Sequence, residues 1–205
     1  MIYKVAAEVK KDVGTVDILV NNAGVVTGKF FLDTPDEDVE YNFRINVLAH
    51  FWTTKAFLSD MIKKNDGHIV TISSAAGIIG VKKLSEYCSS KFANFGYNES
   101  LRAEFLNRKL NIRTLVVSPY YIDTGMFEGV KTRFPILLPI LKQEKVANKI
   151  VEAIKKNRQR LIMPWIVYTV WLLRLFPVPF FDFVANFLGI NNTMDDFVGR
   201  GGTKK

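Results

Sequence analysis

Three short apolar runs, each closed by small polar residues, constrain the fold of this chain more than any other feature. They cover residues 17–20, 67–74 and 112–118. They are continuous rather than alternating, which is typical of strands covered on both faces. Helical patterns separate them, and strands that alternate with helices favour a parallel sheet. The sequence therefore predicts an α/β fold whose ligands bind beyond the carboxyl ends of the strands.

Helix signals fill the spaces between these runs. The first predicted helix, over residues 1–13, is amphipathic, with Val5, Val9 and Val13 at helical spacing before a stop at Gly14. The other expected elements are helices over 34–64, 84–107 and 144–156, and a last strand over 161–163. The helix over 34–64 is expected to kink near Asn46.

Composition excludes several classes of protein. The 205 residues are 48% hydrophobic and 23% charged, which fits an ordered domain rather than a disordered chain. Cys88 is the only cysteine, so no internal disulfide can form and a reducing environment is expected. Two histidines without a cysteine cluster argue against a metal site. The net charge of +8 is scattered in small groups, which argues against nucleic acid and favours a membrane surface.

The strongest chemical constellation consists of Ser74, Tyr87 and Lys91. Tyr87 and Lys91 are four residues apart, so a helix places them on one face. A neighbouring ammonium favours the phenolate and is expected to lower the pKa of Tyr87 from about 10, which suits a phenol for proton transfer. Ser74 ends a predicted strand and can donate a hydrogen bond to a substrate oxygen. These groups together suit the interconversion of an alcohol and a carbonyl, with hydride exchanged with a nicotinamide cofactor.

Four motifs in order resemble the short-chain dehydrogenase/reductase family over nearly the whole chain. They are Asn21-Asn22-Ala23-Gly24, Ile45-Asn46-Val47, Ile72-Ser73-Ser74 and Tyr87-Cys88-Ser89-Ser90-Lys91. The resemblance implies a Rossmann-like, doubly wound parallel sheet. It makes Tyr87 the general acid/base, and Lys91 the residue that lowers the pKa of Tyr87 and holds the nicotinamide ribose. It further implies that Ser74 polarises the substrate oxygen and that Asn46 anchors a water relaying protons to Lys91.

The same resemblance implies the residues that contact the cofactor. They are Asn21, Ala23, Gly24, Tyr87, Lys91, Pro119, Ile122 and Thr124. The cofactor is expected to be NAD, with NADP as the alternative. Tyr120 stands where the family commonly has a glycine after Pro119, which puts the geometry of this loop in question.

Further stretches resemble the 16C branch of the family, among them residues 49–58 and 124–129. That resemblance implies an enzyme of the endoplasmic reticulum membrane or the lipid droplet, facing the cytosol. It would oxidise retinol to retinal, with a steroid as the alternative substrate, and a homodimer is expected.

The glycine-rich turn with which this family holds the cofactor diphosphate does not occur in the sequence. We therefore expect a Rossmann-like domain over residues 1–160 that lacks its first strands and helices. This expectation leaves a second reading open, namely a catalytically inactive, truncated remnant or splice form.

Residues 161–205 form an apolar carboxy-terminal segment rich in aromatic side chains. Its longest uninterrupted apolar run, residues 165–173, is shorter than the roughly 20 residues that a spanning helix needs. Tryptophans and nearby lysines instead fit an element that lies in the membrane interface. A lid over the substrate pocket is the equally weighted alternative.

Three further features carry no predicted chemistry. His50 and His68 are expected to be structural, because no partner pattern supports an acid/base role. Cys88 is expected to be a small buried filler, since nothing near it suggests an activated thiolate. The glycosylation sequon at residues 191–193 is attributed to chance.

Overall fold

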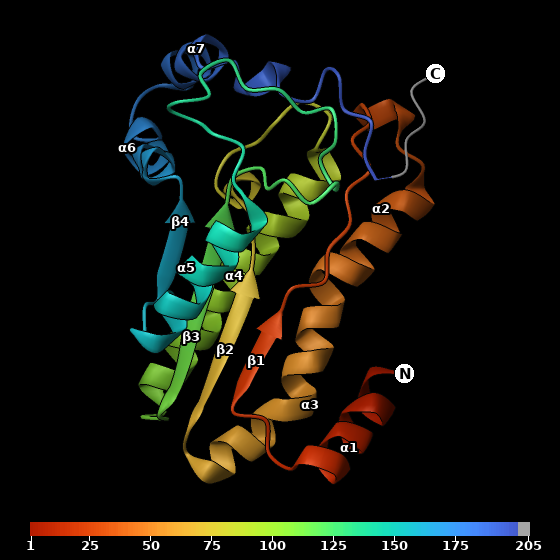
Figure 1. Cartoon of the computed structure of the whole chain (residues 1–205), viewed down its shortest axis with the longest axis vertical. Coiled ribbons are helices and arrows are strands. Elements are labelled where there is room, and N and C mark those ends of the chain that lie inside the picture. Colours follow the sequence, from red (N-terminus) through yellow and green to blue (C-terminus); the bar gives the residue numbers. More distant parts are fainter. Residues whose placement is uncertain (201–205) are drawn as a thin grey trace.

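The computed structural model describes residues 1–200 as a four-stranded parallel sheet flanked by helices (Figure 1). The strand order is β1-β2-β3-β4. The strands are β1 (Ile18–Asn21), β2 (Gly67–Ile72), β3 (Ile112–Pro119) and β4 (Arg160–Met163). The predicted α/β class, its parallel sheet and all four strand positions are confirmed.

Helices cover the two faces of the sheet unequally. The long helices are α1 (Ile2–Val13), α2 (Asp36–Phe43), α3 (Ala49–Lys64), α4 (Ser85–Asn107) and α5 (Gln143–Lys155). Helices α3 and α4 pack on one face, where Met61 and Phe105 meet Ile69 of β2. Helix α5 packs on the other face, where its Val146 and Ala153 join a cluster with residues of β2, β3 and β4. The predicted doubly wound layering is therefore present around the two central strands.

Strand β1 departs from the prediction that both faces of every strand are covered. It lies at the edge of the sheet, and Leu19 packs with the cluster beneath α3. Ile18 and Val20 point to the opposite face and remain 49% and 47% exposed. The expectation was wrong for this strand because α5 packs over β3 and does not reach β1 (Figure 1).

Helix α1 forms over the predicted residues, but its valines are only partly covered. Val5 and Val13 are 50% and 73% exposed, whereas Ala6 is the only buried residue of the helix. Helix α1 packs on α3, where the Lys10 ammonium pairs with Asp60 at 2.6 Å. A small side chain permits the close approach of the two helices, so Ala6 rather than a valine faces the contact.

The helical stretch expected over residues 34–64 is interrupted near Asn46, as predicted. The π-helical turn η2 (Arg44–Leu48) joins α2 to α3 and contains Asn46. Such wide turns are frequent at functional sites because they re-aim one side chain without ending the helix.

The carboxy-terminal segment folds into short helices at the carboxyl end of the sheet (Figure 1). They are α6 (Thr169–Leu173) and α7 (Val178–Phe187) with the 3-10 turns η4 (Trp165–Tyr168) and η5 (Ile190–Asn192). Two further 3-10 turns are η1 (Phe31–Asp33) and η3 (Ala75–Gly77). Within residues 1–200, no helix has the length and hydrophobicity needed to cross a membrane. The boundary predicted at residue 160 falls at the start of β4, and the last five residues of the predicted segment lie outside the described part of the chain.

Candidate active site

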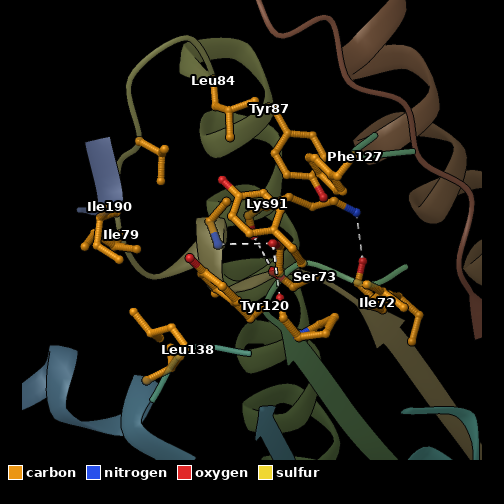
Figure 2. A pocket seen from close by; sticks show the side chains of 18 of the residues that line it. Ile72, Ser73, Ile79, Leu84, Tyr87, Lys91, Tyr120, Phe127, Leu138 and Ile190 are labelled. Atoms are coloured by element: carbon orange, nitrogen blue, oxygen red, sulfur yellow. Dashed lines mark hydrogen bonds between the residues drawn. The ribbon is translucent and has the colours of Figure 1, made fainter. Parts of the chain in front are cut away.

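A cavity of about 630 Å³ opens beyond the carboxyl ends of β1, β2 and β3 (Figure 2). Parallel sheets place their ligand sites at this edge. The predicted site residues that line the cavity are Ala23, Gly24, Ser74, Tyr87, Lys91, Pro119, Ile122 and Thr124. Side chains of α6 and α7, including Val170 and Phe181, form much of the remaining wall. The structure therefore brings most of the predicted residues to one apolar cavity.

Ser74 links the ends of β2 and β3. Its hydroxyl accepts a hydrogen bond from the backbone N–H of Ala76 at 3.1 Å, which caps η3. It donates to the carbonyl of Pro119 at 3.4 Å. Two backbone partners fix the Ser74 hydroxyl at the cavity wall, where it can meet a substrate oxygen.

Tyr87 and Lys91 lie one turn apart near the start of α4, and both are buried. The Lys91 ammonium donates to the carbonyl of Ile72 at 3.0 Å (Figure 2). It also lies 5.6 Å from the centre of the Tyr87 ring. Burial lowers the pKa of Lys91 to about 8, because removal from water penalises the charged form.

The prediction that Lys91 lowers the pKa of Tyr87 is wrong for this structure. Burial of the phenol is the dominant influence and raises the pKa of Tyr87 above its ordinary value, while the Ser74 hydroxyl acts in the opposite direction. Lys91 points its ammonium at the Ile72 carbonyl and lies over the ring rather than at the hydroxyl. Burial therefore favours the protonated phenol, the form that can donate a proton to a carbonyl oxygen.

Asn46 is completely buried, and its amide fixes the loop after β1. Its Oδ1 accepts from the N–H of Val25 at 2.7 Å, and its Nδ2 donates to the Val25 carbonyl at 2.9 Å. The same Nδ2 lies 3.0 Å from both the Asn42 Oδ1 and the Ser90 hydroxyl. Asn46 thus joins three segments of the site, while the water relay implied for it stays a prediction.

Gly24 lies beside both Asn46 and Lys91. A Cβ atom at this position would come within 3.3 Å of the Lys91 Nζ and 3.5 Å of the Asn46 Oδ1. A larger residue would therefore press on the ammonium, which explains a glycine at the end of this motif.

Asn21 is not brought to the cavity. Its Nδ2 donates to the Thr54 hydroxyl at 2.9 Å, and its Oδ1 accepts from the Thr53 hydroxyl at 2.6 Å, so the amide ties β1 to α3. Asn22, which was not among the predicted site residues, lines the cavity instead. Successive side chains of an extended strand point to opposite sides, so the direction of β1 determines which asparagine faces the cavity.

Tyr120 fits into the loop without displacing its neighbours. Its N–H donates to the Met163 carbonyl at 2.7 Å, so the backbone stays tied to β4. Its ring packs against Tyr121 with a centroid distance of 4.6 Å and lines the cavity opposite Leu138 (Figure 2). Burial raises the pKa of Tyr120 to about 12. Pro119, Ile122 and Thr124 still line the cavity, so the absent glycine leaves this wall in place.

Two buried side chains beside the site had no predicted catalytic role, and both hold the loop after β1. The His50 Nε2 lies 3.1 Å from the Ala23 carbonyl. Burial and, secondarily, the charge of Lys91 lower the pKa of His50 to about 4. Glu86 accepts hydrogen bonds from both the N–H and the hydroxyl of Thr27. Glu86 precedes Tyr87 directly, but no sequence pattern indicates that a carboxylate is buried there.

The remaining expectations concern Cys88, His68 and a metal. Cys88 is buried, and burial raises the pKa of its thiol to about 11, so it is no activated thiolate. His68 is buried on β2, and desolvation lowers its pKa. Among residues 1–200, no group of three or more potential ligands could hold a metal ion.

The cavity has the donor set that a nicotinamide nucleotide needs. A ligand can approach the backbone closely at Gly24, which has no side chain. Lys91 offers a positive charge, and Thr124 offers a hydroxyl. The apolar side chains of Ile72 and Ile122 can cover the faces of a planar ring. The residues present therefore fit the nicotinamide half of such a cofactor.

Comparison with known proteins finds one matching family model and close relatives within that family. A family model described as short chain dehydrogenase matches residues 1–133. Short-chain dehydrogenase/reductase family 16C member 6 of Bos taurus is 49% identical over 201 residues, which are 97% of this chain and 64% of that protein. Epidermal retinol dehydrogenase 2 of Homo sapiens is 50% identical over 97% of this chain and 65% of its own length. The chain thus spans slightly less than two thirds of the length of these relatives.

Solved structures agree on the fold. A short chain dehydrogenase/reductase from Burkholderia phymatum in complex with NAD superimposes with a TM-score of 0.73 at 24% identity, over 85% of this chain and 70% of that one. A short-chain dehydrogenase from Streptomyces avermitilis gives a TM-score of 0.71 at 26% identity, over 92% and 72% of the two chains.

Proposed function

The chain belongs to the short-chain dehydrogenase family, and from that premise we propose that it interconverts a lipophilic alcohol and its carbonyl compound with a nicotinamide cofactor. The observation that carries this proposal is the convergence of Ser74, Tyr87 and Lys91 at one apolar cavity. Retinol, oxidised to retinal, is the first candidate substrate, because relatives at 50% and 39% identity are named retinol dehydrogenases. NAD is the first candidate cofactor and NADP the second.

The roles of the residues follow from their positions. Ser74 donates a hydrogen bond to the substrate oxygen and holds it beside the Tyr87 hydroxyl. When a carbonyl is reduced, Tyr87 donates its proton to that oxygen; when an alcohol is oxidised, the deprotonated Tyr87 takes the proton of the alcohol hydroxyl, and Lys91 supplies positive charge beside the ring. The cofactor, when bound, exchanges hydride with the carbon that bears the oxygen. The apolar wall from α6 and α7 accommodates the rest of a long or rigid hydrocarbon.

Cofactor titration tests this proposal. The purified chain is titrated with NADH and NADPH while cofactor fluorescence is followed, and it is then assayed with retinol and with a steroid alcohol. Saturable binding followed by formation of retinal supports the proposal. Absence of binding by both cofactors contradicts it and favours the inactive remnant, and turnover of the steroid alone reassigns the substrate.

We also propose that the carboxy-terminal helices contact the membrane of the endoplasmic reticulum or of a lipid droplet, facing the cytosol. Large apolar side chains on these helices are strongly exposed: Trp165 71%, Leu172 60%, Leu175 80%, Val178 70% and Phe183 68%. They surround the same segment whose inner side lines the cavity, so a lipophilic substrate would have a short path from the bilayer. Co-flotation of the chain with phospholipid vesicles tests the contact, and a chain that stays in the aqueous fraction contradicts it.

A homodimer is proposed through the helices that contain Asn46 and Tyr87. Phe51 on α3 and Phe92 on α4 are each 39% exposed and offer apolar surface for such a contact. Sedimentation velocity decides between monomer and dimer, and a monomer at micromolar concentration contradicts the proposal.

A further inference from the structure

Residues 193–199, which we call the strap, pack beside the cavity against Tyr121 and Phe127 and lead into Arg200, the last described residue. The strap makes backbone, hydroxyl and ionic contacts with two other segments. Val198 donates its N–H to the Glu128 carbonyl at 2.9 Å, and the Tyr121 hydroxyl lies 2.9 Å from the Thr193 hydroxyl. Lys82 pairs with Asp195 at 2.7 Å. The strap is therefore anchored to the loop after β3 and to the segment before α4.

Two glycines make room for the strap. Gly28 lies directly under the ring of Phe197, and a Cβ atom there would overlap that ring. Gly129 lies against the carbonyl of Asp196 in the same way. Both glycines have φ near +80°, at 72° and 88°, a conformation that other residues rarely adopt. The sequence thus leaves room for the strap at Gly28 and at Gly129.

A chain of aromatic rings connects the strap to the proposed catalytic tyrosine. The Phe197 ring lies 6.3 Å from that of Phe127, which meets the Tyr87 ring edge-on at 5.7 Å. Edge-to-face pairs at these distances are favourable. The strap therefore packs in the same apolar cluster as Tyr87.

Arg200 follows the strap immediately and lines the cavity. Among the described residues that line it, Arg200 and Lys91 are the only charged side chains. The Lys91 ammonium is buried and bonded to the Ile72 carbonyl, so it offers little to a ligand at the mouth. Arg200 is exposed, and within residues 1–200 it forms no ion pair.

We propose that Arg200 is an anion-binding residue that holds the phosphate groups of the dinucleotide cofactor, and that the strap places it at the cavity mouth. A guanidinium matches phosphate oxygens with two parallel hydrogen bonds, and such charge-assisted bonds are among the strongest in proteins. The inference rests on the proposed function for the cofactor, but the anion site itself can be tested separately.

The test measures equilibrium binding of NADH and of inorganic pyrophosphate to the full chain by calorimetry. Arg200→Gln is expected to weaken the binding of both ligands about 10-fold and to make the remaining NADH affinity less sensitive to salt. Arg200→Lys should recover part of the lost affinity, since lysine keeps the positive charge but cannot form two parallel hydrogen bonds to a phosphate. Arg158→Gln is the matched control, because Arg158 is an exposed arginine just before β4. It therefore lies at the amino ends of the strands, away from the cavity at their carboxyl ends. Arg158→Gln should leave the affinities for NADH and for pyrophosphate unchanged.

Other outcomes separate this inference from the proposed function. Unchanged NADH binding in Arg200→Gln overturns the anion site and leaves the proposed function intact. Pyrophosphate binding that depends on Arg200, without NADH binding, supports the anion site and contradicts the proposed function. Failure of the wild-type chain to bind either ligand overturns both.

A further variant tests the strap. Phe197→Ala removes the ring that lies over Gly28 and should weaken NADH binding several-fold by releasing Arg200. Full affinity in this variant contradicts the positioning role of the strap.

Discussion

The cavity has two unlike walls, and under the proposed function one would carry out the chemistry while the other would receive the substrate. The wall made by the strand ends and α4 carries buried, bonded polar groups: Ser74 accepts from the Ala76 N–H, and Lys91 donates to the Ile72 carbonyl. Behind this wall, and not lining the cavity, Asn46 is completely buried and contacts Val25, Asn42 and Ser90. The wall made by α6 and α7 is apolar on both sides. Its inner side chains join a core cluster with Val116 and Ile162, and its outer side chains are exposed.

The walls also differ in what fixes their positions. Hydrogen bonds are directional and expensive to break when buried, so the polar wall holds Ser74, Tyr87 and Lys91 in one geometry. The apolar wall is held mainly by packing, with two arginines that donate to backbone carbonyls: Arg174 to Ile78 at 2.6 Å and Arg133 to Phe187 at 3.0 Å. Packing tolerates repacking by other apolar groups. We therefore expect changes in the polar wall to affect rate or folding, and changes on the outer side of the apolar wall to affect neither.

The largest effect is expected from Tyr87→Phe. The variant keeps the ring against Phe127 and Lys91 but removes the proton that the reaction exchanges. The turnover number should fall by roughly 10²–10⁴, measured as retinal formation, while the affinity for NADH stays within about 2-fold. Turnover at the wild-type rate would remove Tyr87 from the mechanism.

The second effect concerns the free energy of unfolding. Asn46→Ala deletes both hydrogen bonds to Val25 and those to Asn42 and Ser90, which leaves several buried groups without partners. The free energy of unfolding should fall by about 3 kcal/mol, since each unsatisfied buried group costs about 1–3 kcal/mol. Urea denaturation measures the change. Asn111→Ala, at an exposed asparagine, is the control and should shift the urea midpoint little. Equal shifts in the two variants would mean that the hydrogen bonds of Asn46 add no stability.

The polar wall was also the more predictable one from sequence. Its main features depend on residues that are close in sequence: the spacing of Tyr87 and Lys91, the serine at a strand end and the irregular helical turn at Asn46. Such local features do not depend on which elements pack nearby. The coverage of β1 was predicted incorrectly because it depends on which elements pack nearby, as the exposed Val20 shows, and the exposure of Val13 on α1 depends on packing in the same way. The burial of Glu86 and the charge environment of Tyr87 arise from residues far apart in the chain, so no spacing could indicate them.

A third effect is a pH dependence of stability caused by His50. Its pKa is about 4 in the folded chain and about 6.5 when unfolded, so the unfolded chain binds the proton more tightly. Stability is therefore lost as the pH falls below about 6.5, and the loss is complete below about 4. Linkage gives a loss on the order of 2 kcal/mol between pH 7 and pH 5. His68, whose pKa is also lowered, adds to it in the same direction.

Urea denaturation of His50→Gln between pH 5 and pH 7 isolates this contribution. Glutamine cannot take up a proton but can still donate to the Ala23 carbonyl that the His50 Nε2 faces. The variant should lose most of the slope and keep only the part due to His68. An unchanged slope would place the titration elsewhere in the molecule.

The smallest effect is expected on the outer face of the apolar wall, and helix α7 permits a comparison within one element. Phe183 is 68% exposed, whereas Ala185 is 8% exposed and belongs to the core cluster. Phe183→Ser should change the free energy of unfolding by no more than about 0.5 kcal/mol, but it should reduce the fraction of the chain that floats with phospholipid vesicles. Ala185→Ser places a hydroxyl among apolar side chains and should destabilise the chain by about 1–3 kcal/mol without reducing flotation. If Phe183→Ser destabilised the chain as much as Ala185→Ser does, the outer face of α7 would be packed rather than free, and the two walls would differ in polarity but not in their tolerance of change.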